Sequence, residues 1–234
     1  MGIRYNEIDF KNKREIVLLK GYPCKYGKCS FCNYIEDNST NESEIEKINF
    51  ETLKEVTGKY GALEVINSGS VFELPNSTLE KIREVAHEKN IKLLYFEIYY
   101  GYKKRLKEIR EFFKGIDIRF RMGMETFDND FRIDHYNKNF SITEKECEEL
   151  GKDLFSVCIL ICVKGQTKEM IDKDIELGLK YFKSITINIF INNGTVVERD
   201  EELVKWFVNK YKHLQADPRV ELLIDNKDLG VFEQ

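Results

Sequence analysis

Three cysteines lie close together near the start of the chain, with the spacing C-x4-C-x2-C over Cys24, Cys29 and Cys32. Thiolates are soft ligands that select zinc, copper(I) or iron–sulfur clusters. A structural zinc site takes a fourth Cys or His, yet the nearest histidine is His87 and the next cysteine is Cys147. Three thiolates without a fourth ligand favour a 4Fe-4S cluster with one open iron, and a zinc site or plain thiols remain the alternatives.

The elements that position these cysteines are strands alternating with helices along the whole chain. Helical patterns begin near Phe50, at an Asn76 cap and at a capping box of Ser141 and Glu144. A basic helix is predicted over 103–113, and others over 167–182 and 200–211. The predicted strands are 16–19, 62–66, 91–96, 117–122, 155–163, 185–191 and, more briefly, 220–224.

Six βα units in series predict an α/β fold with parallel strands, a partial (β/α)6 barrel open on one side. No second domain or repeat is visible, so residues 1–234 are expected to form a single domain. Chemistry in parallel α/β folds is found at the carboxyl ends of the strands. The cysteine loop follows the first predicted strand directly, which is the position such a site requires.

Composition and charge limit the classes of partner. The chain has 234 residues, is 42% hydrophobic and carries a net charge of -4, so no general basic field draws it to nucleic acid and tRNA is an unlikely partner. No segment has the pattern of a signal peptide or a membrane span. We expect a cytoplasmic protein whose cysteines are thiols or metal ligands. Cys158 and Cys162 share one face of a predicted strand and are assigned to the core.

The loop over 21–32 resembles the signature of the radical S-adenosylmethionine superfamily, in which three cysteines follow the first strand of a partial barrel. Phe31, just before the last cysteine, also matches. The usual spacing is C-x3-C-x2-C, so this chain has one extra residue between Cys24 and Cys29. The resemblance implies a 4Fe-4S cluster whose open iron chelates S-adenosylmethionine, from which one electron yields a 5′-deoxyadenosyl radical.

The resemblance extends to the segments after the later strands. It implies that a small polar segment follows the second strand, that acidic residues follow the third and fourth, that a basic residue meets the cofactor carboxylate, and that apolar walls hold adenine. A plain turn, exposed carboxylates, a solvated lysine and ordinary core are the respective alternatives. The cofactor contacts implied in this way are Phe31, Asn67, Ser68, Gly69, Ser70, Glu97, Glu125, Lys138, Ile161 and Asn188.

Within the superfamily, the segments 68–75 and 123–126 with Glu97 resemble the branch of the archaeosine-forming radical enzyme and its compact relatives, the queuine lyases. This implies a lyase that cleaves a C–N bond in a 7-deazaguanine derivative, first of all queuine, to give 7-aminomethyl-7-deazaguanine in queuosine precursor salvage. Strand-end positions suggest substrate contacts, although surface loop residues would look the same. The candidates are Glu73, Tyr99, Tyr100, Asn192, Asn193 and Asp225.

Other functions compete with this interpretation. A radical enzyme acting on modified tRNA would need a local basic patch, and an enzyme that forms the deazaguanine ring would be equally compact. A zinc-binding interaction module is the alternative outside enzymology. The resemblance to radical S-adenosylmethionine enzymes also implies an electron donor such as flavodoxin or ferredoxin. The sequence leaves the oligomeric state open.

Overall fold

A computed structural model describes residues 3–224, which fall into two compact units. The first unit comprises residues 3–27 and 34–120. The second comprises residues 28–33 and 121–224. In this described part of the chain, no helix is both long enough and apolar enough to cross a membrane.

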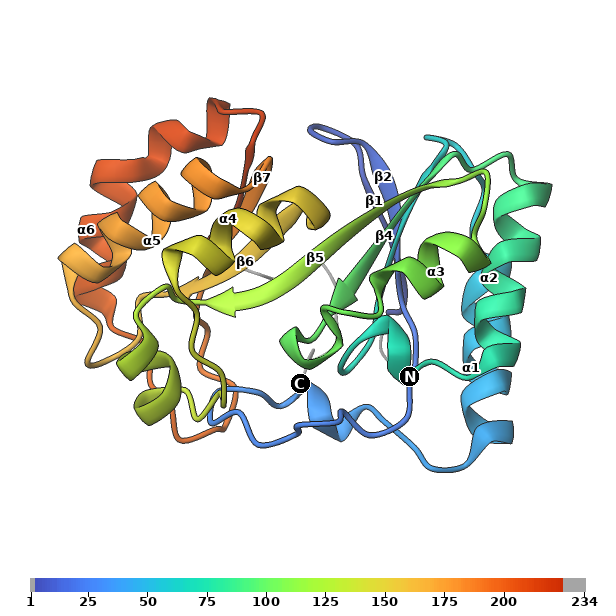
Figure 1. The fold of residues 1–234 in the computed structure, drawn as a ribbon, viewed down its shortest axis with the longest axis horizontal. Coiled ribbons are helices and arrows are strands. Elements are labelled where there is room, and N and C mark those ends of the chain that lie inside the picture. The colour runs from blue at the N-terminus through green and yellow to red at the C-terminus, as the bar shows by residue number, and fades with distance from the viewer. Residues whose placement is uncertain (1–2, 225–234) are drawn as a thin grey trace. The chain divides into compact units, whose positions relative to one another are not determined.

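The first unit is built on parallel strands that follow one another along the chain (Figure 1). β2 pairs in parallel with β3, and β3 with β4, whereas β1 runs antiparallel to β2 at the edge. The elements are β1 (Tyr5–Ile8), β2 (Arg14–Leu18), η1 (Tyr34–Glu36), α1 (Glu42–Lys54), β3 (Ala62–Ile66), η2 (Val71–Glu73), α2 (Asn76–Glu88), β4 (Leu93–Ile98), η3 (Tyr100–Tyr102) and α3 (Leu106–Phe112).

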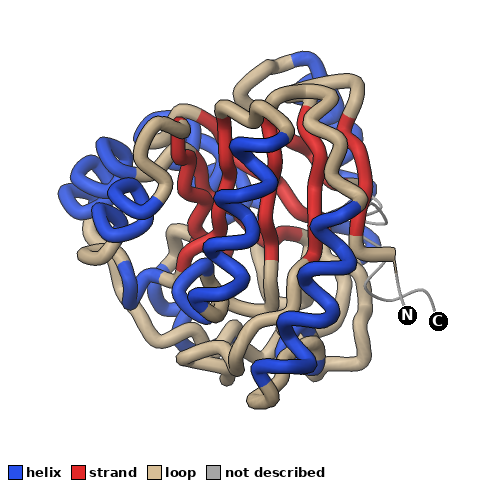
Figure 2. Tube along the Cα trace, turned by 90° about the vertical axis from the view of Figure 1, so that its right-hand side faces the viewer, coloured by secondary structure: helices blue, strands red, loops and turns tan. Residues whose placement is uncertain are grey.

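Helices α1 and α2 lie side by side over one face of these strands (Figure 2). All five residues of β2 and of β3 are buried, as expected for parallel strands covered on both faces. β5 (Asp117–Glu125) begins in the first unit and ends in the second.

The second unit repeats the same pattern of alternating helices and parallel strands. β5 pairs with β6, β6 with β7, and β7 with β8, all in parallel, and the register of β5 shifts between Gly123 and Glu125. The elements after β5 are the π-helical turn η4 (Phe131–His135), α4 (Glu144–Asp153), β6 (Ser156–Ile161), α5 (Lys168–Tyr181), β7 (Ser184–Ile189), α6 (Glu201–Tyr211), η5 (Lys212–Ala216) and β8 (Val220–Leu223).

The sheet order follows the chain from β1 to β8. Consecutive order is that of a (β/α) barrel, because a doubly wound sheet reverses its order at a switch point. The predicted fold class, a partial barrel of parallel strands, is therefore confirmed. The short strand expected over 220–224 is β8, and the antiparallel β1 was not predicted.

Two predicted helix starts are wrong. α1 begins at Glu42 and not near Phe50, because the side chain of Asn41 accepts a hydrogen bond from the Glu44 amide and caps the helix. The capping box is formed by Thr143 and Glu146, two residues beyond the predicted pair of Ser141 and Glu144.

Another prediction is wrong in detail, at the start of α2. This helix does begin at Asn76, but Pro75 is the capping residue and no side chain caps it. Proline has no amide proton and fixes its own backbone angle, so it can stand at the start of a helix without a side-chain bond.

Gly151 in α4 allows a test of the packing in the second unit. Replacing glycine by alanine within a helix ordinarily adds up to about 1 kcal/mol of stability. Here a Cβ atom would lie 2.0 Å from the carbonyl oxygen of Tyr181, so we expect Gly151→Ala to lower the free energy of unfolding by about 1–3 kcal/mol in urea denaturation. Lys152→Ala, at the next, exposed position, is the control and should change stability little. A Gly151→Ala protein more stable than wild type would contradict the packing.

Candidate active site

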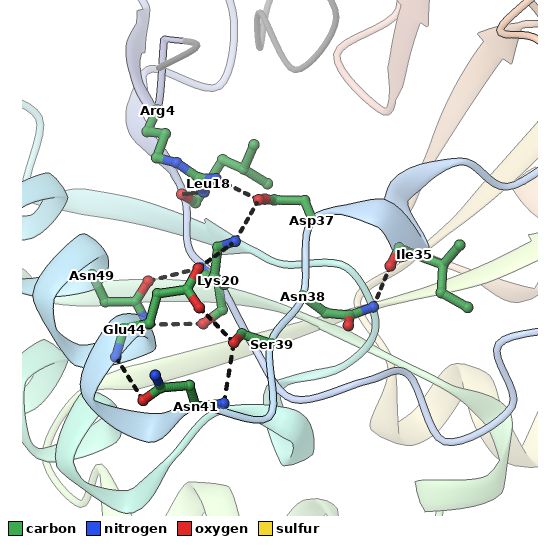
Figure 3. A network of polar contacts seen from close by, with 10 residues as sticks. All are labelled: Arg4, Leu18, Lys20, Ile35, Asp37, Asn38, Ser39, Asn41, Glu44 and Asn49. Atoms are coloured by element: carbon green, nitrogen blue, oxygen red, sulfur yellow. Dashed lines mark hydrogen bonds and ion pairs between the residues drawn. The ribbon is translucent and has the colours of Figure 1, made fainter.

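A polar network in the first unit joins the residues before the cysteine segment to the residues after it (Figure 3). Gly21 accepts a hydrogen bond from the Ser39 amide at 3.1 Å. The ammonium of Lys20 lies 3.7 Å from Asp37 and 3.2 Å from Glu44. These contacts join the end of β2 to the start of α1, so both ends of the cysteine segment leave from a fixed position.

Asn49 of α1 completes this network by binding the main chain of Lys20. Its Oδ1 accepts from the Lys20 amide at 2.7 Å, and its Nδ2 donates to the Lys20 carbonyl at 2.8 Å. Nδ2 also donates to Thr78 of α2 at 3.1 Å. A fully buried carboxamide thus ties the end of β2 to both covering helices.

The cysteine loop itself is divided between the two units. Cys24 belongs to the first, and Cys29 and Cys32 belong to the second. All three are half-buried, and none of them is in a disulfide bond. Among the residues that the structure describes, no three His, Cys, Asp or Glu side chains are gathered as a ready ligand set.

In the second unit, the part of the loop around Cys29 and Cys32 is held by the end of η4 and the two residues after it. Ser30 donates from its amide to the carbonyl of Tyr136 at 3.0 Å and from its hydroxyl to the carbonyl of His135 at 2.6 Å. The side chain of Asn137 donates to the carbonyl of Lys28 at 2.6 Å. These three bonds fix the backbone between and before the two thiols.

Phe31 and Asn193 also meet at this part of the loop. The Phe31 ring stands edge-on to the Tyr136 ring at 5.2 Å. The Asn193 carboxamide donates to the carbonyl of Phe31 at 2.8 Å and to Asn33 at 3.1 Å. Asn193, predicted to contact substrate, therefore supports the loop, while the exposed Asn192 accepts from the Arg199 amide at 2.8 Å.

The segment after β3, in the first unit, is buried and polar. Asn67 donates to the carbonyl of Ser70 at 3.1 Å, and the hydroxyl oxygen of Ser68 is buried without a partner. A Cβ atom on Gly69 would lie 3.2 Å from Cβ of Cys24, a tight contact that glycine avoids. The Ser68 oxygen is therefore open for a hydrogen bond, next to Gly69, which lies close to Cys24.

Three further predicted residues of the first unit lie after β3 and at the end of β4. Glu97 is half-buried within β4. The Tyr99 ring stacks on the Tyr26 ring, with centroids 6.0 Å apart and planes inclined by 14°. Glu73 is buried, and this burial raises the pKa of its carboxyl although Tyr102 donates a hydrogen bond to it.

A buried ion pair lies at the end of β5 in the second unit. The ammonium of Lys138 is 2.6 Å from Oε1 of Glu125. Burial opposes the charge on Lys138, but Glu125, Cys29 and Cys158 together hold its pKa above the ordinary value. A Cβ atom on Gly123 would lie 2.5 Å from the carboxylate and 2.9 Å from the ammonium, so the glycine gives this pair its space. The site therefore offers one anion and one cation side by side.

Glu125 is held in the left-handed region, with φ of 63°, a conformation that costs a non-glycine residue about 1 kcal/mol or more. Arg132, fully buried, stabilises it by donating to the carbonyls on both sides, at Met124 at 3.1 Å and at Thr126. The same guanidinium donates to Asn129 at 2.7 Å. Its fork is therefore what fixes the direction of the Glu125 side chain.

Asp174 of α5 supports the same segment from the other side. Its Oδ1 accepts from the Phe127 amide at 2.6 Å and from the Thr126 hydroxyl at 3.0 Å. Sequence reasoning assigned no role to Asp174 or to Arg132. A signal existed for Asp174, because it occupies the apolar face of its helix with Ile171 and Ile175 at i−3 and i+1.

The remaining predicted cofactor residues lie on β6 and β7. Asn188 pairs with Leu160, and Ile161 pairs with Ile189 one position further on, so Asn188 and Ile161 point to opposite faces of the strands. The Oδ1 atom of Asn188 is buried without a partner. Asp225 lies outside the described residues.

Comparison with known proteins supplies the class. No family model and no curated protein matches the chain. Two structures of SuiB from Streptococcus suis, one bound to S-adenosylmethionine and one to its precursor peptide SuiA, are 14% and 15% identical with TM-scores of 0.56 and 0.53. These matches cover 88% of this chain and 49% and 48% of SuiB. These two matches show the fold alone.

A solved structure of a queuine lyase from Clostridium spiroforme, bound to SAM and queuine, gives the finer assignment. It is 50% identical to this chain, with a TM-score of 0.94, and the match covers 100% of both chains. At this identity over the whole length, the chain belongs to the queuine lyase family of radical S-adenosylmethionine enzymes. The resemblance inferred from the cysteine loop is therefore confirmed.

Arg132 provides a test of the polar contacts that support Glu125 in the second unit. Arg132→Met removes the donors and leaves carbonyls that the guanidinium now satisfies, so we expect a loss of about 3 kcal/mol or more in the free energy of unfolding. Arg132→Lys should lose nearly as much, because an ammonium cannot reproduce the planar fork. Arg219→Met removes an exposed arginine of the same unit and is the control. Equal stability of Arg132→Met and Arg219→Met in urea denaturation would contradict this role.

The pH dependence of stability tests Asp174. Burial raises the pKa of this carboxyl to about 7, from a value near ~4 in an exposed aspartate. The folded state thus binds the proton more tightly, so the stabilisation is complete below about pH 4 and is lost as the pH rises through 7. We expect a decline of about 2–4 kcal/mol over this range.

Urea denaturation at a series of pH values measures this decline, which should shrink in Asp174→Asn. Asp172→Asn, which changes a partly exposed carboxylate on the same helix, is the control. An unchanged pH profile in Asp174→Asn would refute the assignment of the decline to this group.

Proposed function

We propose that this chain is a radical S-adenosylmethionine lyase that cleaves the C–N bond of queuine and releases 7-aminomethyl-7-deazaguanine. The observation that carries the proposal is the full-length match, at 50% identity, to a queuine lyase whose structure holds SAM and queuine. The cysteine loop after β2 and the buried polar positions near it agree with this function.

The residues present fit a cluster and its cofactor. Cys24, Cys29 and Cys32 are in no disulfide bond, and their thiolates have the donor chemistry that an iron–sulfur cluster requires. Neither zinc nor an interaction module is needed to explain them, because the family is one of enzymes. When bound, a reduced cluster and S-adenosylmethionine would supply a carbon radical able to take a hydrogen atom from the cyclopentenyl group of queuine.

The chain's own residues would hold the cofactor and shield the reaction. The buried Glu125–Lys138 pair presents a carboxylate and an ammonium, which suits a zwitterionic amino acid group. The open hydroxyl of Ser68 can donate or accept a hydrogen bond, and the open Oδ1 of Asn188 can accept one. Phe31, Asn67, Gly69, Ser70, Glu97 and Ile161 remain predicted cofactor contacts.

Substrate contacts remain predictions at Glu73, Tyr99, Asn192, Asn193 and Asp225. A planar deazapurine suits a stacked aromatic ring such as that of Tyr99. A cytoplasmic location and an electron donor of the flavodoxin or ferredoxin type complete the proposal. A modified tRNA is the alternative substrate, and the net charge of -4 disfavours it.

The proposal is tested by anaerobic incubation of the reconstituted protein with reductant, S-adenosylmethionine and queuine, followed by mass spectrometry of the bases. We expect 7-aminomethyl-7-deazaguanine and 5′-deoxyadenosine, and neither product from Cys32→Ala. About four iron and four sulfide per chain are expected, in place of about one zinc. Deoxyadenosine without loss of queuine would refute the substrate but not the family, and a parallel incubation with queuosine-containing tRNA tests the alternative.

A further inference from the structure

The stretch between Cys24 and Cys29 is one residue longer than the usual loop. Its first residue, Lys25, is bound to a carboxylate from another segment of the first unit. The amide of Lys25 donates to Oε1 of Glu73 at 3.2 Å. The Tyr22 amide donates to the main-chain carbonyl of Glu73 at 2.8 Å. Glu73 therefore binds the main chain on both sides of Cys24.

Glu73 is itself held in place. The hydroxyl of Tyr102 donates to the same Oε1 atom at 2.9 Å, and the side chains of both residues are buried, at 5% and 8% exposure. The ammonium of Lys25 lies over the Tyr102 ring, 4.9 Å from its centroid. One tyrosine thus fixes the carboxylate and covers the residue that the carboxylate binds.

Gly69 has both Glu73 and Cys24 as close neighbours. A Cβ atom at Gly69 would lie 2.8 Å from Oε2 of Glu73 and 3.2 Å from Cβ of Cys24. Gly69 therefore lies next to both Cys24 and the Glu73 carboxylate, and a larger residue at this position would press on both. Stacking of Tyr26 on Tyr99 fixes the next residue of the loop.

We propose that Glu73, oriented by Tyr102, is a positioning residue that holds Cys24 and the lengthened loop in place for cluster binding. One carboxylate oxygen of Glu73 accepts hydrogen bonds from both the Lys25 amide and the Tyr102 hydroxyl. These bonds hold the loop in place although it has one extra residue. The inference rests on the proposed function only in taking Cys24 as a cluster ligand. The loop contact itself needs neither cluster nor substrate.

Trypsin tests the anchor in protein without cluster, because Lys25 and Lys28 are exposed and the loop must open to be cut. We expect Glu73→Ala to raise the rate of cleavage after Lys25 about tenfold, as the loss of hydrogen bonds worth about 1.4 kcal/mol would. Cleavage after Lys164, in the other unit, is the internal reference. An unchanged rate after Lys25 would overturn the proposal.

Glu73→Gln removes the negative charge of the side chain but keeps a hydrogen-bond acceptor, so it separates a positioning role from a role that needs the charge. The glutamine carbonyl still accepts from the Lys25 amide and the Tyr102 hydroxyl, so we expect nearly wild-type protection of the loop and normal iron content after reconstitution. Glu73→Ala should hold less iron and lose it faster to a chelator, and Tyr102→Phe should fall between the two. Equal iron retention in the glutamine and alanine variants would show that Glu73 does not position the loop.

Cys24→Ala is the matched control. It removes the thiol but leaves the anchor, so its loop should resist trypsin while its cluster is lost. If instead Cys24→Ala exposes Lys25 as much as Glu73→Ala does, the thiol and not the carboxylate orders the loop, and the proposal fails. A negative queuine assay would leave these proteolysis results unaffected, so the two failures can be told apart.

Discussion

Parallel pairing of consecutive strands is the constraint on which the candidate residues of each unit depend. Because each strand runs in the same direction as the strand before it, the loops that follow them emerge at one edge of each unit's strands. In the first unit, this brings the Lys25 amide after β2, Glu73 after β3 and Tyr102 after β4 into direct contact. In the second, it places Glu125 at the end of β5, where Arg132 and Lys138 meet it.

Much of this could be read from the sequence, because the relevant signals are local. Buried strands show as apolar runs, and cysteines directly after the first of them identify a ligand loop by context. The starts of α1 and α4 were placed wrongly, since acidic first turns resemble loops and only the cap geometry reveals them. Asn41 and Thr143 accept the amide bonds that mark the true starts.

The supporting partners could not be predicted, because they depend on contacts distant in sequence. Nothing near Glu73 in the chain indicates that a tyrosine 29 residues later will donate to it. Arg132 looks like a surface residue in its local sequence, yet it is fully buried. A charged residue enters a core only when the fold supplies acceptors, and here they are the carbonyls beside a left-handed glutamate.

The antiparallel strand β1 has a consequence for how copies of this protein behave together. β2 is buried at every position, and an apolar strand left at a sheet edge would expose unpaired amides to a neighbouring molecule. β1 covers that edge with four partly exposed residues, and Glu7 pairs with Lys59. A strand of four residues that carries an ion-paired glutamate is a poor template for further pairing, so β1 shields β2 from edge-to-edge pairing with another copy.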